Sequence, residues 1–240
     1  MEVISLKICY YASTCGNVRK NNEDSFNINK HIGCKLKYKK GFRLLKNNNI
    51  ISVCDGMGGE EFGEVASSLA VNNLSKLKDF SKDAIVNKIV DINEMVCEEI
   101  KKRDVRLGST VVCAVVRKND FDIYNVGDSR AYIYNNKLIQ LSKDHTVAAL
   151  NGKSKGALTQ HLGVFKEEIE IEPFVIDNIN IKKGNYILLC SDGLYDMIEE
   201  KDIEKILKSK LSDFKKRDLL LERALNNGGK DNITFLLVRC

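Results

Sequence analysis

Short apolar segments separated by turn residues make up most of this sequence, and their order constrains the fold more than any other feature. Turn residues such as Lys118-Asn119 and Asn135-Asn136 join neighbouring segments closely enough for hairpins, which indicates antiparallel pairing. We predict strands at residues 3–9, 26–29, 36–45, 50–54, 109–116, 121–126, 131–134, 138–141, 168–176, 186–190 and 233–238.

Helical spacing of apolar residues occurs in two pairs of segments. The first pair covers residues 61–77 and a stretch beginning after Ser81, and the second pair covers 201–208 and 214–225. Strands in blocks and helices in pairs favour antiparallel sheets covered by helices over a parallel βαβ arrangement. We therefore predict an α+β fold in which the helix pairs cover the outer faces of a sheet sandwich.

Composition and charge are those of an ordinary globular protein. The 240 residues are 43% hydrophobic and 30% charged, and 38 basic against 33 acidic residues leave a net charge of +5. The local run Lys35, Lys37, Lys39 and Lys40 is better explained as a solvated edge strand or loop than as a nucleic-acid patch. The longest apolar runs are far too short for a membrane span. We expect neither nucleic acid nor a membrane as a partner.

The eight cysteines contain no Cys-x-x-Cys pair, and several lie inside apolar runs, where cysteine behaves as a small buried hydrophobe. The first residues lack the basic start and long apolar stretch of a secretory signal. Reduced thiols in a cytoplasmic protein are therefore expected.

Acidic residues stand at the ends of predicted strands, and this is the most informative pattern in the sequence. Each of these acids is fixed to a rigid element, from which it could point into a common cleft. They are Glu23 and Asp24 before strand 26–29, Asp55 after 50–54, Asp128 after 121–126, Asp192 after 186–190, and Asp231 before 233–238.

One Asp-Gly pair alone would be read as a turn. Several carboxylates at one rim repel each other and are costly to desolvate unless a cation lies among them. Hard cations such as Mg²⁺ or Mn²⁺ prefer these oxygen ligands, and the main chain of Gly56 can approach a metal because no side chain intervenes. Zinc is disfavoured because His31, His145 and His161 show no ligand spacing.

Arg19 lies five residues before Asp24, and its guanidinium group suits two oxygens of a phosphoryl group. A plain surface arginine is the alternative. Acids for metals and an arginine for an oxyanion together indicate metal-assisted phosphoester hydrolysis. Two metals about 3.5–4 Å apart could polarise the phosphate and lower the pKa of a bridging water.

These residues lie in motifs that resemble the metal-dependent serine/threonine protein phosphatases (PPM, type 2C) in their compact bacterial form. The motifs follow in family order from about residue 8 to residue 239. They are RKNNEDS (19–25), VCDGMGG (53–59) with GEVA (63–66), GST (108–110), NVGDSR (125–130), LSKDHT (141–146), LTQHLG (158–163), LCSDGL (189–194) and GKDNIT (229–234).

The resemblance implies one domain over residues 1–240, built as a central sandwich of two antiparallel β-sheets flanked by antiparallel helix pairs. It implies Mn²⁺ or Mg²⁺ as cofactor, with two metals and possibly a third. Catalytic roles would fall to Arg19, Asp55 and Asp192, and Arg19 would bind the substrate phosphate. The implied metal ligands are Asp55 as the bridge between two metals, the carbonyl of Gly56, Asp192 and Asp231, Glu23 and Asp24 through waters, and Asp128 with Asp192 for a third metal.

The implied activity is hydrolysis of phosphoserine and phosphothreonine esters in proteins by a metal-bridging water. The implied partners are phosphorylated proteins, in a bacterium substrates of a Hanks-type serine/threonine kinase. A catalytically weak or inactive phosphoprotein-binding module of the same fold is the alternative, and it would show lost metal ligands.

The sequence departs from the family pattern in three places. Many eukaryotic relatives carry, at the position of Met57, a histidine proposed as general acid. Bacterial members have methionine there, as this sequence does. Gln160 replaces the usual arginine beside His161, which is a candidate proton donor. The flap over the active site, at about residues 147–157, is shortened.

Overall fold

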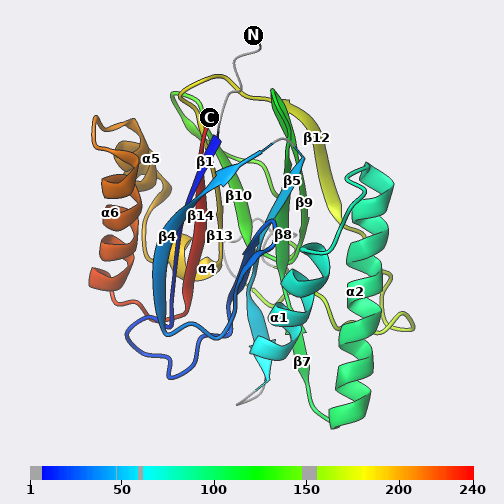
Figure 1. Cartoon of the computed structure of the whole chain (residues 1–240). Coiled ribbons are helices and arrows are strands. Elements are labelled where there is room, and N and C mark those ends of the chain that lie inside the picture. The colour runs from blue at the N-terminus through cyan, green and yellow to red at the C-terminus, as the bar shows by residue number, and fades with distance from the viewer. Residues whose placement is uncertain (1–6, 47, 59–61, 148–155) are drawn as a thin grey trace.

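A computed structural model describes residues 7–46, 48–58, 62–147 and 156–240, and it contains two six-stranded antiparallel sheets packed face to face (Figure 1). The first sheet has the order β11 (Leu138–Gln140), β10 (Arg130–Tyr134), β13 (Tyr186–Cys190), β14 (Ile233–Arg239), β1 (Lys7–Thr14) and β4 (Tyr38–Leu45). The second has the order β12 (Phe174–Asn180), β9 (Asp120–Val126), β8 (Val111–Val116), β5 (Asn49–Cys54), β2 (Ser25–Ile28) and β3 (His31–Gly33).

The alternation of side chains along each strand builds three apolar layers. On β5, Ile51 and Val53 face the core between the sheets, while Ile50 and Cys54 face the outer helices. Because both faces of the central strands are buried, these strands are continuous apolar runs rather than alternating ones.

The helices cover the two outer faces. Helices α1 (Gly63–Leu74) and α2 (Lys82–Arg103) pack on the second sheet, and α5 (Glu200–Lys208) and α6 (Asp213–Asn226) pack on the first. The predicted sandwich of antiparallel sheets with helices outside is confirmed. In the described parts of the chain, every helix is too short or too polar to span a bilayer.

The predicted strand at 168–176 was placed too early. The alternation of glutamate and isoleucine over 168–172 mimics a strand, but pairing with β9 begins only at Phe174. Ile171 is buried against the layer of α1 and α2 without belonging to a strand. The alternation of apolar and polar residues at 168–172 therefore reflects the burial of one loop residue, Ile171, and not a strand.

The predicted strand at 109–116 is divided in the structure. Residues Leu107–Ser109 form β7, which pairs with β6 (Gly56–Gly58) in a separate two-stranded ribbon, and β8 begins at Val111. The division falls at Thr110, whose N–H donates to the carbonyl of Asp55 at 2.9 Å. Neither β6, β3 nor the short helix α4 (Asp192–Tyr195) was predicted. The predicted strand at 3–9 partly lies outside the described residues, and β1 continues to Thr14.

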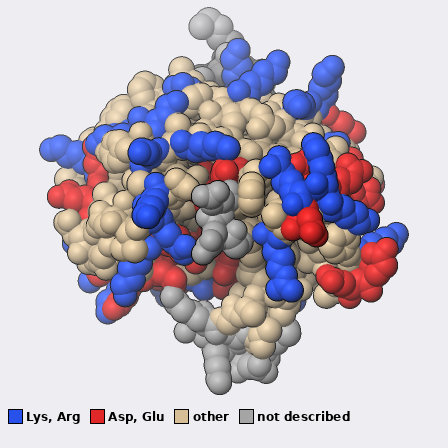
Figure 2. Space-filling view, turned by 90° about the horizontal axis from the view of Figure 1, so that it is seen from below, with Lys and Arg blue, Asp and Glu red and all other residues tan. Residues whose placement is uncertain are grey.

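All eight cysteines are free thiols. The lysine run falls partly on β4, an edge strand of the first sheet, where Lys40 forms an ion pair with Asp218. Figure 2 shows lysine and arginine side chains spread over the face seen from below, with acidic side chains between them.

Candidate active site

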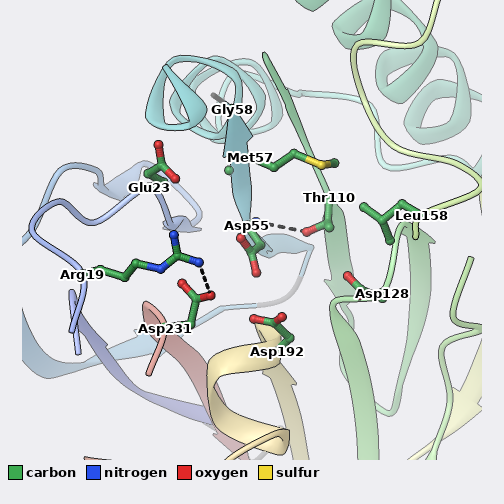
Figure 3. Close-up of a pocket in the computed structure, with 11 residues that line it drawn as sticks. Arg19, Glu23, Asp55, Met57, Gly58, Thr110, Asp128, Leu158, Asp192 and Asp231 are labelled. Atoms are coloured by element: carbon green, nitrogen blue, oxygen red, sulfur yellow. Dashed lines mark hydrogen bonds and ion pairs between the residues drawn. The ribbon is translucent and has the colours of Figure 1, made fainter. Parts of the chain in front are cut away.

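Strands of both sheets end beside one cleft of about 250 Å³, and most of the predicted acids lie in its wall (Figure 3). Five of the six predicted acids line it, and Asp24 does not. The lining residues are Arg19, Glu23, Asp55, Gly56, Met57, Gly58, Thr110, Asp128, Leu158, Asp192 and Asp231.

Asp55 is held by its main chain. Its N–H donates to Thr110 Oγ1 at 3.0 Å, and its carbonyl accepts from the Thr110 N–H at 2.9 Å and from Ser109 Oγ at 3.0 Å. With both main-chain groups bonded to the β7–β8 junction, the carboxylate projects into the cleft from the end of β5.

Gly56 lines the cleft with main-chain atoms because a side chain has no space there. A Cβ at this position would lie 2.3 Å from the carbonyl oxygen of Gly63, at the start of α1. The close approach of these two glycines sets the first turn of α1 against β6. The reason for glycine in both motifs is therefore packing as well as access to the main chain.

Asn232 joins the segments that carry three of the acids. Its Oδ1 accepts from the Glu23 N–H at 2.7 Å, and its Nδ2 donates to the carbonyls of Cys15 and Asn21. A Cβ on Gly193 would lie 1.9 Å from the Asn232 carbonyl oxygen, so only glycine allows α4 to start this close to β14. Asp192 and Asp231 are thereby placed side by side with the Glu23 segment.

Asp24 lies behind the cleft rather than in its wall. It is buried, and its Oδ2 accepts from Ser191 Oγ at 2.8 Å. Its Oδ1 is buried with no hydrogen-bond partner among the described residues. Glu23, by contrast, lines the cleft and accepts from the Gly63 N–H through Oε1 at 3.2 Å.

Asp128 is positioned from the second sheet by its main chain. Its carbonyl accepts from the Tyr195 hydroxyl at 3.1 Å, and the Arg130 guanidinium lies 3.9 Å from the centre of the Tyr195 ring. Arg130 also makes a bidentate ion pair with Asp144. Together with the hydrogen bond from the Gly127 N–H to His145 Nδ1, these contacts agree with supporting roles for Asp144 and His145.

The acids perturb one another. Burial, followed by the charges of neighbouring aspartates, raises the pKa of Asp24 to about 7 and that of Asp192 to about 6, and it raises the pKa of Asp55 well above its usual range. The pKa values of Asp128 and Glu23 are also raised, mainly by burial. Such a cluster is stable in its ionised form only when positive charge lies close by.

The donor set fits hard divalent cations. Among the described residues, no three histidine, cysteine, aspartate or glutamate side chains lie close enough together to hold a metal ion by themselves. The cleft instead offers spaced carboxylates around the main chain of Gly56, and Asp24 has an unpartnered buried oxygen beside it. Mg²⁺ and Mn²⁺ keep several water ligands and suit such an open set of oxygen donors, whereas structural zinc needs a closed one.

Arg19 reaches the same cleft and forms an ion pair that the sequence did not predict. Its Nη2 lies 2.7 Å from Asp231 Oδ2, with the two side chains 54% and 38% exposed. This hydrogen bond with Asp231 raises the pKa of Arg19, so the guanidinium remains charged at any working pH. Its exposed face leaves it accessible to a ligand in the cleft.

His161, the candidate proton donor, does not line this cleft. Its ring lines a neighbouring pocket, with Nδ1 2.9 Å from the carbonyl oxygen of Leu162. The predicted flap at 147–157 lies for the most part outside the described residues. Near its end, Leu158 contributes to the cleft wall and Gln160 accepts from the Glu172 N–H at 3.0 Å.

Some residues of the site were not singled out from the sequence. Ser191 and Tyr195 flank the Asp192 motif, and each bonds to a different segment that carries an acid. The available signal was their position, since Ser191 precedes Asp192 within the Ser-Asp-Gly motif and Tyr195 follows that motif by two residues. Their partners, 167 and 67 residues away, could not be read from it.

A two-sheet sandwich with an acid-lined, oxygen-donor cleft and an arginine at its rim defines the class of metal-dependent phosphomonoester hydrolases. The sequence profile described as Protein phosphatase 2C matches residues 9–155. The chain belongs to this family, and it is a metal-dependent serine/threonine protein phosphatase.

Individual relatives agree with this assignment. The chain is 34% identical to the serine/threonine phosphatase stp of Listeria welshimeri, over 93% of this chain and 92% of that protein. A crystal structure described as a bacterial serine phosphatase superposes with a TM-score of 0.81 at 28% identity, covering 96% of each chain. The catalytic domain of the phosphatase PstP, in complex with two manganese ions, superposes with a TM-score of 0.77 at 27% identity, over 98% of this chain and 99% of that one.

Proposed function

We propose that this chain removes phosphate from phosphoserine and phosphothreonine in proteins, with two divalent cations held by the acidic cleft and residues 1–240 acting as one catalytic domain. The observation that carries the proposal is the convergence of carboxylates from both sheets on one cleft that also contains Arg19. The manganese ions in the PstP structure support Mn²⁺ as the cation, with Mg²⁺ as the alternative.

In this proposal Asp55 and the main chain of Gly56 hold cations from one side of the cleft, and Asp192 and Asp231 hold them from the other. Glu23 and Asp24 contribute through water, and Asp128 with Asp192 offers a place for a third cation. When bound, the cations supply charge for the phosphoryl oxygens and lower the pKa of a bound water. The ligand set is intact, which favours an active enzyme over a binding module.

Arg19 binds the phosphate of the substrate. Its guanidinium carries five donors and uses one nitrogen for Asp231, so other N–H groups remain for phosphoryl oxygens. The bond to Asp231 fixes the orientation of the fork before the substrate arrives, which reduces the entropy lost on binding.

The substrates are phosphorylated proteins, and a Hanks-type serine/threonine kinase is the proposed source of the phosphate. The eight free thiols favour a reducing compartment such as the cytoplasm.

The first test is phosphate release from a phosphothreonine peptide by the purified chain, with Mn²⁺ and with excess EDTA. Turnover is expected with Mn²⁺ and should vanish with EDTA, because without cations nothing in the described cleft lowers the pKa of the attacking water, and Arg19 alone cannot balance the five acids of its wall. A folded chain that binds Mn²⁺ but releases no phosphate would instead support the phosphoprotein-binding module.

Replacing Arg19 with alanine is expected to raise the KM for a phosphopeptide about tenfold, since charge-assisted bonds to the phosphate are lost. Lys20→Ala, the same charge change on the adjacent exposed residue, should leave KM unchanged. Mn²⁺ affinity is measured in parallel by calorimetry. A variant in which only Mn²⁺ affinity changes would show that Arg19 positions Asp231 and does not bind phosphate.

A further inference from the structure

A second pocket of about 500 Å³ adjoins the acidic cleft, and the two share Met57 and Gly58 in their walls. The remaining lining residues come from the end of α2, from the connection between α2 and β7, from β7 itself and from the segment after Leu158. They are Ile100, Arg106, Leu107, Gly108, His161, Gly163, Phe165 and Glu168.

The β6–β7 ribbon connects the two hollows. Gly56 at one end of β6 lines the acidic cleft and pairs with Ser109, whereas Gly58 at the other end pairs with Leu107 in the second pocket. Gly108 has no space for a side chain, because a Cβ would lie 2.8 Å from the Leu162 carbonyl oxygen. Because Met57 and Gly58 lie in the walls of both hollows, a substrate chain that leaves the cleft past Met57 reaches the second pocket.

The chemistry of the second pocket differs from that of the cleft. Its apolar surface comes from Met57, Ile100, Leu107 and Phe165, and Arg106 contributes a positive charge to its wall. Arg106 is exposed and has no hydrogen bond or ion pair within the part of the chain that the structure describes. Neighbouring cations are engaged differently, since Arg103 bonds to Glu99 and Lys101 lies 5.2 Å from the centre of the Phe165 ring.

We propose that this pocket binds the polypeptide next to the phosphorylated residue and prefers an apolar side chain accompanied by an acidic one. This inference rests on the proposed function. An apolar side chain of the substrate buries surface against Ile100 and Phe165, and the carboxylate beside it pairs with Arg106. Arg106 lies in the pocket wall and Lys101 lies over the Phe165 ring, so these two cations disfavour a basic neighbour although Glu168 also lines the pocket.

The proposal is tested with two phosphothreonine peptides that differ at one flanking position, Leu-Glu in one and Leu-Lys in the other. The two peptides are made once with the flanking residues before the phosphothreonine and once with them after it, which gives four peptides. Values of kcat/KM are divided by that for p-nitrophenyl phosphate, which has no flanking chain and reports the cleft alone. For the wild type we expect the Leu-Glu peptide to be favoured about fivefold to tenfold on one side.

Arg106→Glu is expected to reverse this preference, and Arg106→Gln to abolish it. Lys102→Glu is the matched control, because it makes the same charge change four residues away, in the last turn of α2, without lining the pocket, and it should keep the wild-type preference. An Arg106→Glu variant that keeps the wild-type ratio of Leu-Glu to Leu-Lys turnover would overturn the inference. If that variant still hydrolyses p-nitrophenyl phosphate, the proposed function is unaffected. Absence of turnover on every substrate with Mn²⁺ would overturn both.

Discussion

Asp192→Asn is expected to reduce kcat on the order of a thousandfold while raising the stability of the metal-free protein. The loss of turnover follows because one carboxylate that holds cations is removed, and cation charge contributes several kcal/mol to the transition state of phosphoester hydrolysis. Asparagine has nearly the same shape, so the turn into α4 and its packing on Asn232 are kept. The rate is measured with a phosphothreonine peptide at saturating Mn²⁺.

The gain in stability has an electrostatic cause. Burial and the charges of Asp128 and Asp231 raise the pKa of Asp192 to about 6, so its ionised form is unfavourable in the folded protein at neutral pH. Removing that charge relieves repulsion in the cluster. In EDTA, calorimetry should show a higher Tm for Asp192→Asn than for the wild type, and the increase in Tm on adding Mn²⁺ should shrink.

Asp202→Asn is the control, because the pKa of Asp202 is shifted in the direction opposite to that of Asp192. Asp202 is a half-buried residue of α5, far from the cleft, whose pKa is lowered by its hydrogen bond with Lys205, so its replacement should leave turnover intact and stability unchanged or slightly reduced. Wild-type turnover in Asp192→Asn would remove Asp192 from the catalytic residues. Lost turnover with a lower metal-free Tm would mean that the residue is mainly structural.

A residue of this site could be predicted from the sequence when the residues next to it in the chain indicated its place, and not when its place depends on distant segments. Asp55 and Asp192 were predicted because each ends an apolar strand that is legible from its own few residues. The ion pair between Arg19 and Asp231 joins residues 212 positions apart, and no local pattern contains it. The seclusion of Asp24 behind Ser191 depends on how β2 meets β13, which is a property of the packed sandwich.

The same distinction explains the fold. Strands β5, β8, β13 and β14 were recovered because burial on both faces makes them continuous apolar runs. The strand at 168–176 was misplaced because the burial of Ile171 under the helix layer imitates a strand period. The ribbon β6–β7 was missed because its strands are glycine-rich and are defined by partners rather than by side chains.

The free energy of unfolding of the metal-free protein is expected to fall by about 6 kcal/mol between pH 4 and pH 7 relative to the Mn²⁺-saturated protein. The pKa of Asp192 is raised to about 6 and that of Asp24 to about 7, from 3.8 for an ordinary aspartate. Within this window the folded state holds protons that the unfolded chain has released. Stability therefore falls as pH rises.

Urea unfolding at several pH values, in EDTA and in saturating Mn²⁺, measures this effect. Burial lowers the pKa of His145, so this residue contributes stability that rises with pH and opposes the trend in either curve alone. The difference between the two curves cancels that contribution and should widen toward neutral pH, because the cations favour the ionised carboxylates. Asp192→Asn should narrow the difference. A difference that does not change with pH would show that the cleft acids are not the groups to which the cations are coupled.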